Sequence, residues 1–364
     1  MEAGKLADWL VEALWAGLQT LWSYIAEHTV FCLIPAFFIA GAIGALLKKD
    51  AVLRYFGREV KPYLSYGVAS VSGTVLAVCS CTILPLFQGI YKKGAGIGPA
   101  TAFLYAGPAI NVLAIIYTAR LLGPQLGLAR AVAAISLSVV IGAFMALIFR
   151  KEERQKAQEE KKKAAVKRNS ADDGRPGWVT FSFFALLVAI LVIGTAPLEL
   201  WIRLAAINLL ILVVAGLLVY YFTRDEATEW GNETWDTVKK IFPVLLAGAF
   251  LVGIIAYFVP PDTFRPYIGG NSPVSCLMAA VVGALLYMPT LLEVPIIGTT
   301  LGYSQGVMGG GPALALLLSG PAVSLPSMLV LYRLVGGRKT AAYILLVVLT
   351  SAFAGFIYGQ VGGQ

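Results

Sequence analysis

The sequence predicts an all-α polytopic membrane protein built from two internal repeats. Hydrophobic residues make up 58% of the 364 positions, charged residues make up only 13%, and the mean hydropathy is +0.78. A soluble domain carries about twice that fraction of charge. Apolar stretches of bilayer-spanning length recur along the chain, namely residues 30–47, 126–149, 178–196 and 204–222.

The repeat is visible as a motif that contains a Gly-Pro pair. Residues 99–111 read PATAFLYAGPAIN, and residues 312–324, which lie 213 positions later, read PALALLLSGPAVS. Proline lacks a donor N–H and clashes with the preceding helical turn, so each pair is expected to break its helix. Matched breaks in two halves of a membrane protein are typical of a transport site between internal repeats.

Further matches set the boundaries of the repeats. Gly73 corresponds to Gly283 and Pro85 to Pro295, and the offset varies only between 210 and 213 residues. We therefore expect a first transmembrane repeat over residues 1–150, a charged cytoplasmic linker over 151–177, a linking transmembrane helix over 178–197 and a second transmembrane repeat over 198–364.

Charge indicates how the repeats are oriented. Ten of the 28 basic residues lie in residues 150–177, which the positive-inside rule places in the cytoplasm. The net charge of +8 is thereby explained without a nucleic-acid partner. If every apolar segment spans, about 16 of the 28 basic residues lie inside, against about 22 if residues 97–122 and 310–334 are re-entrant hairpins. The second count predicts inverted repeats with about nine transmembrane helices and two re-entrant hairpins.

The tips of these hairpins supply the first candidate site. Its residues are Gly107, Pro108 and Asn111 in one half and Gly320, Pro321 and Ser324 in the other. Proline suits the first position of a new half-helix, and the glycine before it permits the bend. Helix N-terminal N–H groups at such a tip favour anionic or electron-rich ligands, and Asn111 and Ser324 can hydrogen-bond to a substrate. The alternative is a structural kink that packs on a neighbouring helix.

A Cys-Ser-Cys-Thr run, Cys79–Ser80–Cys81–Thr82, is the second candidate site. Two thiols on a membrane helix can bind a soft metal or an arsenical, or cycle as a dithiol. Neighbouring positions of a helix face different directions, so Cys79 and Cys81 converge only if the helix unwinds there. The alternative is that small buried residues allow close packing. The four cysteines fit neither a disulfide scaffold nor a zinc finger, and no resident cofactor is expected.

Glu293 is the third candidate, because it lies in an apolar segment between Pro289 and Pro295. An ionisable group inside a membrane is costly and is functional by default. Desolvation favours its protonated form, which makes Glu293 a candidate carrier of a coupling proton. The alternative is a salt bridge to a cation such as Arg130 or Arg333.

These motifs, in this order, carry a resemblance to a known family. They are Cys79-Ser-Cys-Thr with Pro85, Gly107-Pro-Ala-Ile-Asn111, Glu293-Val-Pro295 and Gly320-Pro-Ala-Val-Ser324. The chain resembles, over nearly its whole length, the bacterial and archaeal predicted permeases typified by YraQ, which include the organoarsenical exporter ArsP. The resemblance implies a multi-pass permease of the prokaryotic cytoplasmic membrane and, for the ArsP branch, efflux of trivalent organoarsenicals. The Cys-Ser-Cys stretch suits such a thiophilic substrate.

We therefore expect a secondary transporter, not an enzyme, that exports a small molecule or ion across the lipid bilayer by alternating access. The sequence contains no Walker A motif, which argues against ATP hydrolysis. Two rival functions stay open. One is a membrane thiol–disulfide oxidoreductase that uses Cys79 and Cys81 with a soluble redox partner, and the other is a channel.

Overall fold

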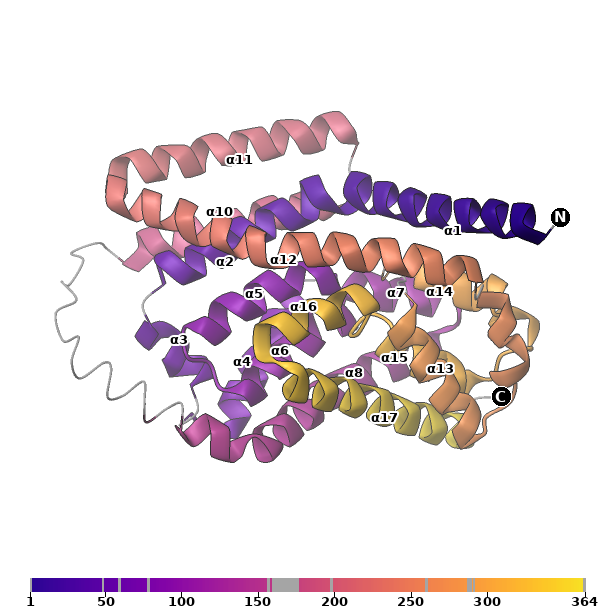
Figure 1. Ribbon diagram of the computed structural model, residues 1–364. Helices are drawn as coiled ribbons and strands as arrows, with labels where there is room; N and C mark the ends of the chain where they lie inside the picture. The colour runs from indigo at the N-terminus through magenta and orange to yellow at the C-terminus, as the bar shows by residue number, and fades with distance from the viewer. Residues whose placement is uncertain are drawn as a thin grey trace.

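The computed structural model describes residues 2–47, 49–57, 60–76, 79–155, 158, 177–196, 199–258, 261–286, 290 and 292–362. Within these ranges every regular element is a helix (Figure 1). Most of the predicted charged linker, residues 156–157 and 159–176, lies outside the described residues.

Five described helices are long and apolar enough to cross a bilayer. They are α8 (Pro124–Ile148), α10 (Gly177–Thr195), α11 (Leu200–Tyr221), α12 (Arg224–Phe258) and α17 (Gly337–Val361). A sixth span results if the bent pair α6 (Ile97–Ala109) and α7 (Val112–Leu121) is counted as one. The predicted all-α membrane class is thereby confirmed, whereas nine spans and inverted repeats stay predictions.

The N-terminal segment is helical without a break from Glu2 to Ala45, but not as one regular helix. It consists of α1 (Glu2–Tyr24), a π-helix (Ile25–Leu33) and α2 (Ile34–Ala45). The α-helix resumes where Pro35 enters its first turn, a position that suits proline. Both α1 and α2 pack along α12 (Figure 1). Small residues allow this approach, since a Cβ on Gly253 would lie only 2.6 Å from the Thr20 hydroxyl.

Two groups of three helices form the centre of the molecule. In one group α4 (Pro62–Leu76), α6 and α8 pack against one another, and in the other α13 (Pro273–Leu285), α15 (Gly310–Ser319) and α17 do the same. Glycines make both groups compact. A Cβ on Gly98 would lie 2.8 Å from the Gly142 carbonyl oxygen, and a Cβ on Gly311 would lie 2.8 Å from that of Gly355.

Shorter helices connect the two groups. α5 (Ser80–Lys92) packs against α2 and α16 (Leu325–Val335), and α7 packs against α14 (Glu293–Pro295). The remaining described elements are α3 (Lys49–Phe56), a π-helix at Ile296–Thr300, and 3₁₀-helices at Pro261–Tyr267 and Tyr303–Gln305. Helices from both halves of the sequence therefore meet around α5, α7, α14 and α16.

A buried lysine joins the two groups at one end of the bundle. Lys339, in the first turn of α17, is only 4% exposed. Its Nζ lies 3.3 Å from Oε1 of Glu153, just after α8, and 3.2 Å from the hydroxyl oxygen of Tyr91 in α5. The Glu153 carboxylate also accepts a hydrogen bond from the N–H of Ile97, so the starts of α6 and α17 share one acceptor.

Candidate functional site

The first predicted break lies three residues later than the sequence indicated. α6 continues through Gly107 and Pro108 and ends at Ala109. Near a helix C-terminus, the missing proline N–H removes only one bond of the last turn, and Ile110 N–H still donates to the Ala106 carbonyl at 2.9 Å. The expectation that Pro108 begins a new half-helix is therefore wrong. The helix breaks at Ile110 and Asn111 instead.

The direction of the chain changes only moderately at this break. α7 is bent by 42° from α6. A bend at such a break occurs both in a broken span and in a re-entrant loop, so the hairpin over residues 97–122 stays a prediction. The hairpin expected over residues 310–334 stays a prediction.

The second break does fall on its Gly-Pro pair. α15 ends at Ser319, residues 320–324 are non-helical, and α16 begins at Leu325. Pro326, rather than Pro321, occupies the first turn of the new helix. The two breaks thus share a sequence motif but differ in where the helix stops.

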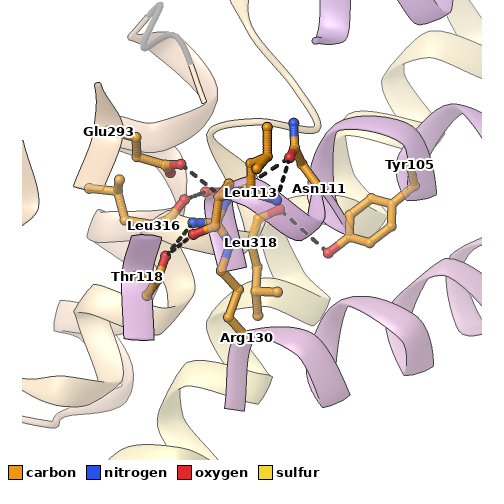
Figure 2. A network of polar contacts seen from close by, with 10 residues as sticks. Tyr105, Asn111, Leu113, Thr118, Arg130, Glu293, Leu316 and Leu318 are labelled. Atoms are coloured by element: carbon orange, nitrogen blue, oxygen red, sulfur yellow. Dashed lines mark hydrogen bonds and ion pairs between the residues drawn. The ribbon is translucent and has the colours of Figure 1, made fainter. Parts of the chain in front are cut away.

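Asn111 and Ser324 are the N-caps of the helices that follow the breaks. Asn111 Oδ1 accepts hydrogen bonds from the N–H groups of Leu113 at 3.0 Å and Ala114 at 3.3 Å (Figure 2). Ser324 forms a capping box with Ser327, whose hydroxyl lies 2.8 Å from the Ser324 backbone nitrogen. Such caps satisfy helix N–H groups that would otherwise lack acceptors. The two polar residues predicted to bind substrate therefore also hold the helix starts.

Substitution at Asn111 separates these two roles. Asn111→Ala removes the cap, and we expect the free energy of unfolding to fall by about 1 kcal/mol. Asn111→Asp keeps an acceptor oxygen and should restore most of that stability. Thermal unfolding in detergent, compared with flux in proteoliposomes, tests both variants. If Asp restores stability but not flux, the amide group acts on the substrate; if it restores both, Asn111 is only a cap.

Each break packs closely against an earlier glycine. A Cβ on Gly73 would lie 2.9 Å from the Gly107 backbone nitrogen, and a Cβ on Gly283 would lie 3.1 Å from that of Gly320. The side chains that cover the two breaks differ. Gly107 faces Ile83, whereas Gly320 faces Glu293, whose Oε1 would lie 2.8 Å from an added Cβ.

An ion pair is buried at the second break. Arg130 in α8 and Glu293 in α14 are both 0% exposed, and Nη2 of Arg130 lies 3.5 Å from Oε2 of Glu293 (Figure 2). Nη1 of Arg130 donates to the Thr118 hydroxyl in α7 at 2.9 Å. Of the two cations considered from the sequence, Arg130 is the partner. The pair joins helices from the two halves of the chain.

The ion pair retains unused hydrogen-bonding capacity. Nε of Arg130 and Oε1 of Glu293 are buried, and neither has a hydrogen-bond partner among the described residues. Close by, the Tyr105 hydroxyl in α6 donates to the Leu318 carbonyl in α15 at 3.4 Å, which links the two broken helices (Figure 2). The sequence did not mark Thr118, because a threonine in an apolar helix carries no signal until its partner is known.

The thiols form a second cluster around the start of α5. Cys79 precedes α5 in an extended conformation, as convergence with Cys81 required, and the Cys81 thiol hydrogen-bonds to it. Cys32 joins them from the π-helix, with its Sγ 3.5 Å from Cys79 Sγ and 2.7 Å from the Thr82 hydroxyl oxygen. Cys32 lies 47 residues before Cys79 in the sequence, and the packing of α2 and the π-helix on α5 brings the two together.

No group of three or more His, Cys, Asp or Glu side chains in the described part of the chain is arranged to hold a metal ion. The predicted site residues are also enclosed: of the eleven, ten are buried and Cys79 is half-buried. The thiols, the breaks and the ion pair therefore lie inside the bundle in this conformation.

Several apolar spans and a polar, buried centre define a multi-pass membrane protein of the permease class. A model described as "Predicted permease" (ArsP_1) matches residues 14–360, and the chain belongs to this family. It is 40% identical to UPF0718 protein MJ0584 of Methanocaldococcus jannaschii over 94% of each chain. It is 24% identical to UPF0718 protein YraQ of Escherichia coli K12 over 81% of this chain and 67% of the other. No solved structure matches.

Proposed function

We propose that this permease is a secondary transporter of the prokaryotic cytoplasmic membrane that exports a small solute by alternating access. The substrate would bind between the two breaks, at residues 107–111 and 320–324. The observation that carries this proposal is the buried Arg130–Glu293 pair. It joins the two halves at a break, where its desolvation is costly unless the site has a function that needs it.

The packing supports the proposal of two repeats. The group α4, α6 and α8 resembles the group α13, α15 and α17 in its helix order and in its paired glycines, Gly98 with Gly142 and Gly311 with Gly355. The connections are also reciprocal, because α5 contacts α16 while α14 contacts α7. A two-fold relation between the halves produces such exchanged contacts, and the charge distribution favours an inverted one.

The ion pair suggests how a proton would be coupled to transport. Protonation of Glu293 removes the charge that holds Arg130. The guanidinium, with its unused Nε, can then turn to an electron-rich group of the substrate. Proton release would restore the pair and displace that group. This exchange gives the two states of the site different charge partners, which alternating access with coupling requires.

The thiol cluster supports a thiophilic substrate, such as a trivalent organoarsenical or a soft metal ion. Cys32 and Cys79 hold their sulfur atoms 3.5 Å apart, and thiolate sulfur is the ligand that soft metals prefer. The cluster lies beside the first break, since Ile83, which follows Thr82, packs on Gly107. The thiols that bind the substrate and the first break would thus form one site.

Flux of a trivalent methylarsenical tests the substrate and the proton coupling separately. We expect inside-out vesicles containing the wild-type protein to accumulate this probe when a proton gradient is imposed, and Cys32→Ser and Cys79→Ser to lose at least tenfold in flux. Cys276→Ser is the matched control, because Cys276 is buried in α13 against Gly311 and should leave flux unchanged. Flux that survives every cysteine substitution would reject the thiophilic substrate. Accumulation that does not depend on the proton gradient would reject proton coupling.

One distance supports a second function. Sulfur atoms 3.5 Å apart, in Cys32 and Cys79, need only a small movement to form a disulfide, and their oxidation would pass two electrons to the disulfide of a soluble partner. Thiol trapping under oxidising and reducing conditions distinguishes this exchange from transport. A Cys32–Cys79 disulfide that forms reversibly favours the oxidoreductase, whereas thiols that stay reactive under oxidising conditions favour the transporter.

A further inference from the structure

A cavity of about 850 Å³ lies at the end of α8 that leads into the basic linker. α4, the first turn of α6 and the end of α8 form its walls. None of its lining residues belongs to the breaks, the ion pair or the thiol cluster. A cavity of this size holds a drug-sized ligand or a substantial part of a lipid.

One wall changes from apolar to basic where α8 ends and the following helical segment begins. Ala143, Ala146, Leu147, Arg150 and Arg154 line the cavity. Ala143, Ala146 and Leu147 share one side of α8, because they are spaced by three and four residues. After a turn at Phe149, residues 150–155 are helical again, and Arg150 and Arg154 share one side of that helix because they are four residues apart. A ligand that follows this wall therefore needs an apolar part and an anionic end.

The opposite wall contains a buried hydroxyl without a protein partner. Ser65 in α4 lines the cavity, is 2% exposed, and its Oγ has no hydrogen-bond partner among the described residues. A buried hydroxyl in that situation is unfavourable. A polar group of a bound molecule would satisfy it.

Among the described residues that line the cavity, Glu153 is the one carboxylate, and it does not repel an anion strongly. Its Oε2 accepts a hydrogen bond from the N–H of Ile97 at 3.2 Å and its Oε1 lies 3.3 Å from Nζ of Lys339. Its charge is therefore balanced within the protein, and Arg150 and Arg154 determine the charge that the cavity presents.

The cavity is accessible from the side of the bundle. Leu147 lines it and is 64% exposed on the surface of α8. α8 is long and apolar enough to span a bilayer, so an opening beside Leu147 would face lipid, and the two arginines follow the end of this helix.

We propose that this cavity binds an anionic phospholipid. The headgroup phosphate would lie between Arg150 and Arg154, the Ser65 hydroxyl would donate to an ester or phosphate oxygen, and an acyl chain would follow Ala143 and Leu147 toward the bilayer. Two arginines on one helical turn suit a phosphate group, which accepts several charge-assisted hydrogen bonds.

Lipid binding to the purified full-length protein tests this site without any transport measurement. We expect native mass spectrometry to show that phosphatidylglycerol binds more tightly than phosphatidylcholine. Arg150→Gln/Arg154→Gln should weaken phosphatidylglycerol binding about 30-fold, since each basic residue near a membrane surface contributes a factor of about five. Arg224→Gln/Lys239→Gln removes the same charge from exposed positions of α12 outside the cavity, and it should retain the wild-type preference.

Two further measurements separate the cavity from simple surface attraction. Ala143→Phe fills the apolar part and leaves both arginines in place, so it should also lower phosphatidylglycerol binding at least fivefold. Glycerol 1-phosphate is a soluble headgroup without acyl chains. At a concentration at which phosphatidylglycerol saturates the site, it should fail to displace bound phosphatidylglycerol. Equal loss of binding in the α12 control, or undiminished binding in Ala143→Phe, would overturn the proposal. Displacement of the lipid by glycerol 1-phosphate would overturn the lipid proposal and show that the cavity binds a soluble phosphate.

Discussion

Replacing Arg130 with leucine should lower the free energy of unfolding by about 3–5 kcal/mol, which is the usual effect of leaving one partner of a buried ion pair without its countercharge. Glu293 is 0% exposed, and among the described residues Arg130 is the cation that pairs with it. Its carboxylate must then stay protonated or draw water into the bundle. Thermal unfolding in detergent measures this effect, with the loss of monodisperse protein on size-exclusion chromatography as the readout.

The double variant Arg130→Leu/Glu293→Leu separates stability from transport. With both charges removed, the pair leaves no uncompensated buried charge, and we expect stability to return close to that of the wild type. Flux should be abolished in this double variant, because Glu293 is no longer present to carry the proton. Arg120→Leu, an exposed position in α7, is the matched control and should change stability by less than about 0.5 kcal/mol. A stable Arg130→Leu single variant with normal flux would show that the pair is dispensable.

Alanine at the two glycine contacts should destabilise both groups of three helices to a similar extent. In Gly142→Ala the new Cβ would meet the Gly98 carbonyl oxygen at 2.8 Å, and in Gly355→Ala it would meet that of Gly311. A backbone oxygen cannot move aside without separating the helices, so we expect a loss of about 1–3 kcal/mol in each variant. Thermal unfolding in detergent measures both.

The control for this pair changes stability in the opposite direction. Gly216 in α11 has no atom within 4 Å of an added Cβ. Gly216→Ala should therefore stabilise the helix by up to about 1 kcal/mol, because alanine has the higher helix propensity. The same substitution would then change the free energy of unfolding in opposite directions at residue 216 and at residues 142 and 355. This would show that close helix approach, and not glycine itself, matters at residues 142 and 355. A large effect at only one of these two positions would count against equivalent repeats.

The membrane class could be predicted from the sequence because length and charge content are local properties of a segment. Glu293 was recognisable for the same reason, since a carboxylate in an apolar stretch is unusual wherever it lies. Its partner was not decidable, because Arg130 and Arg333 both lie in apolar surroundings of the sequence. Only the packing of α8 against the second half buries Arg130 and leaves Arg333 exposed.

The position of the breaks could be predicted only approximately. A proline limits where a helix can continue, but the last turn tolerates it, and Asn111 supplies a cap three residues beyond Pro108. Cys32 shows a different limit. Its contact with Cys79 depends on how α2 and the π-helix lie against α5, and no local pattern around Cys32 indicates that packing.

The proposed repeat duplicates the scaffold but not the side chains that cover its breaks. Gly107 faces Ile83 while Gly320 faces Glu293, and Arg130 in α8 corresponds by position to Tyr343 in α17. A pseudo-symmetric carrier with identical half-sites would bind its cargo equally well from either side of the membrane. Here a charged side chain covers one break, and aliphatic groups beside the thiols cover the other. In the proposed alternating-access cycle the inward-open and outward-open states would therefore differ in energy, and apparent affinities measured from the two faces of the membrane should differ.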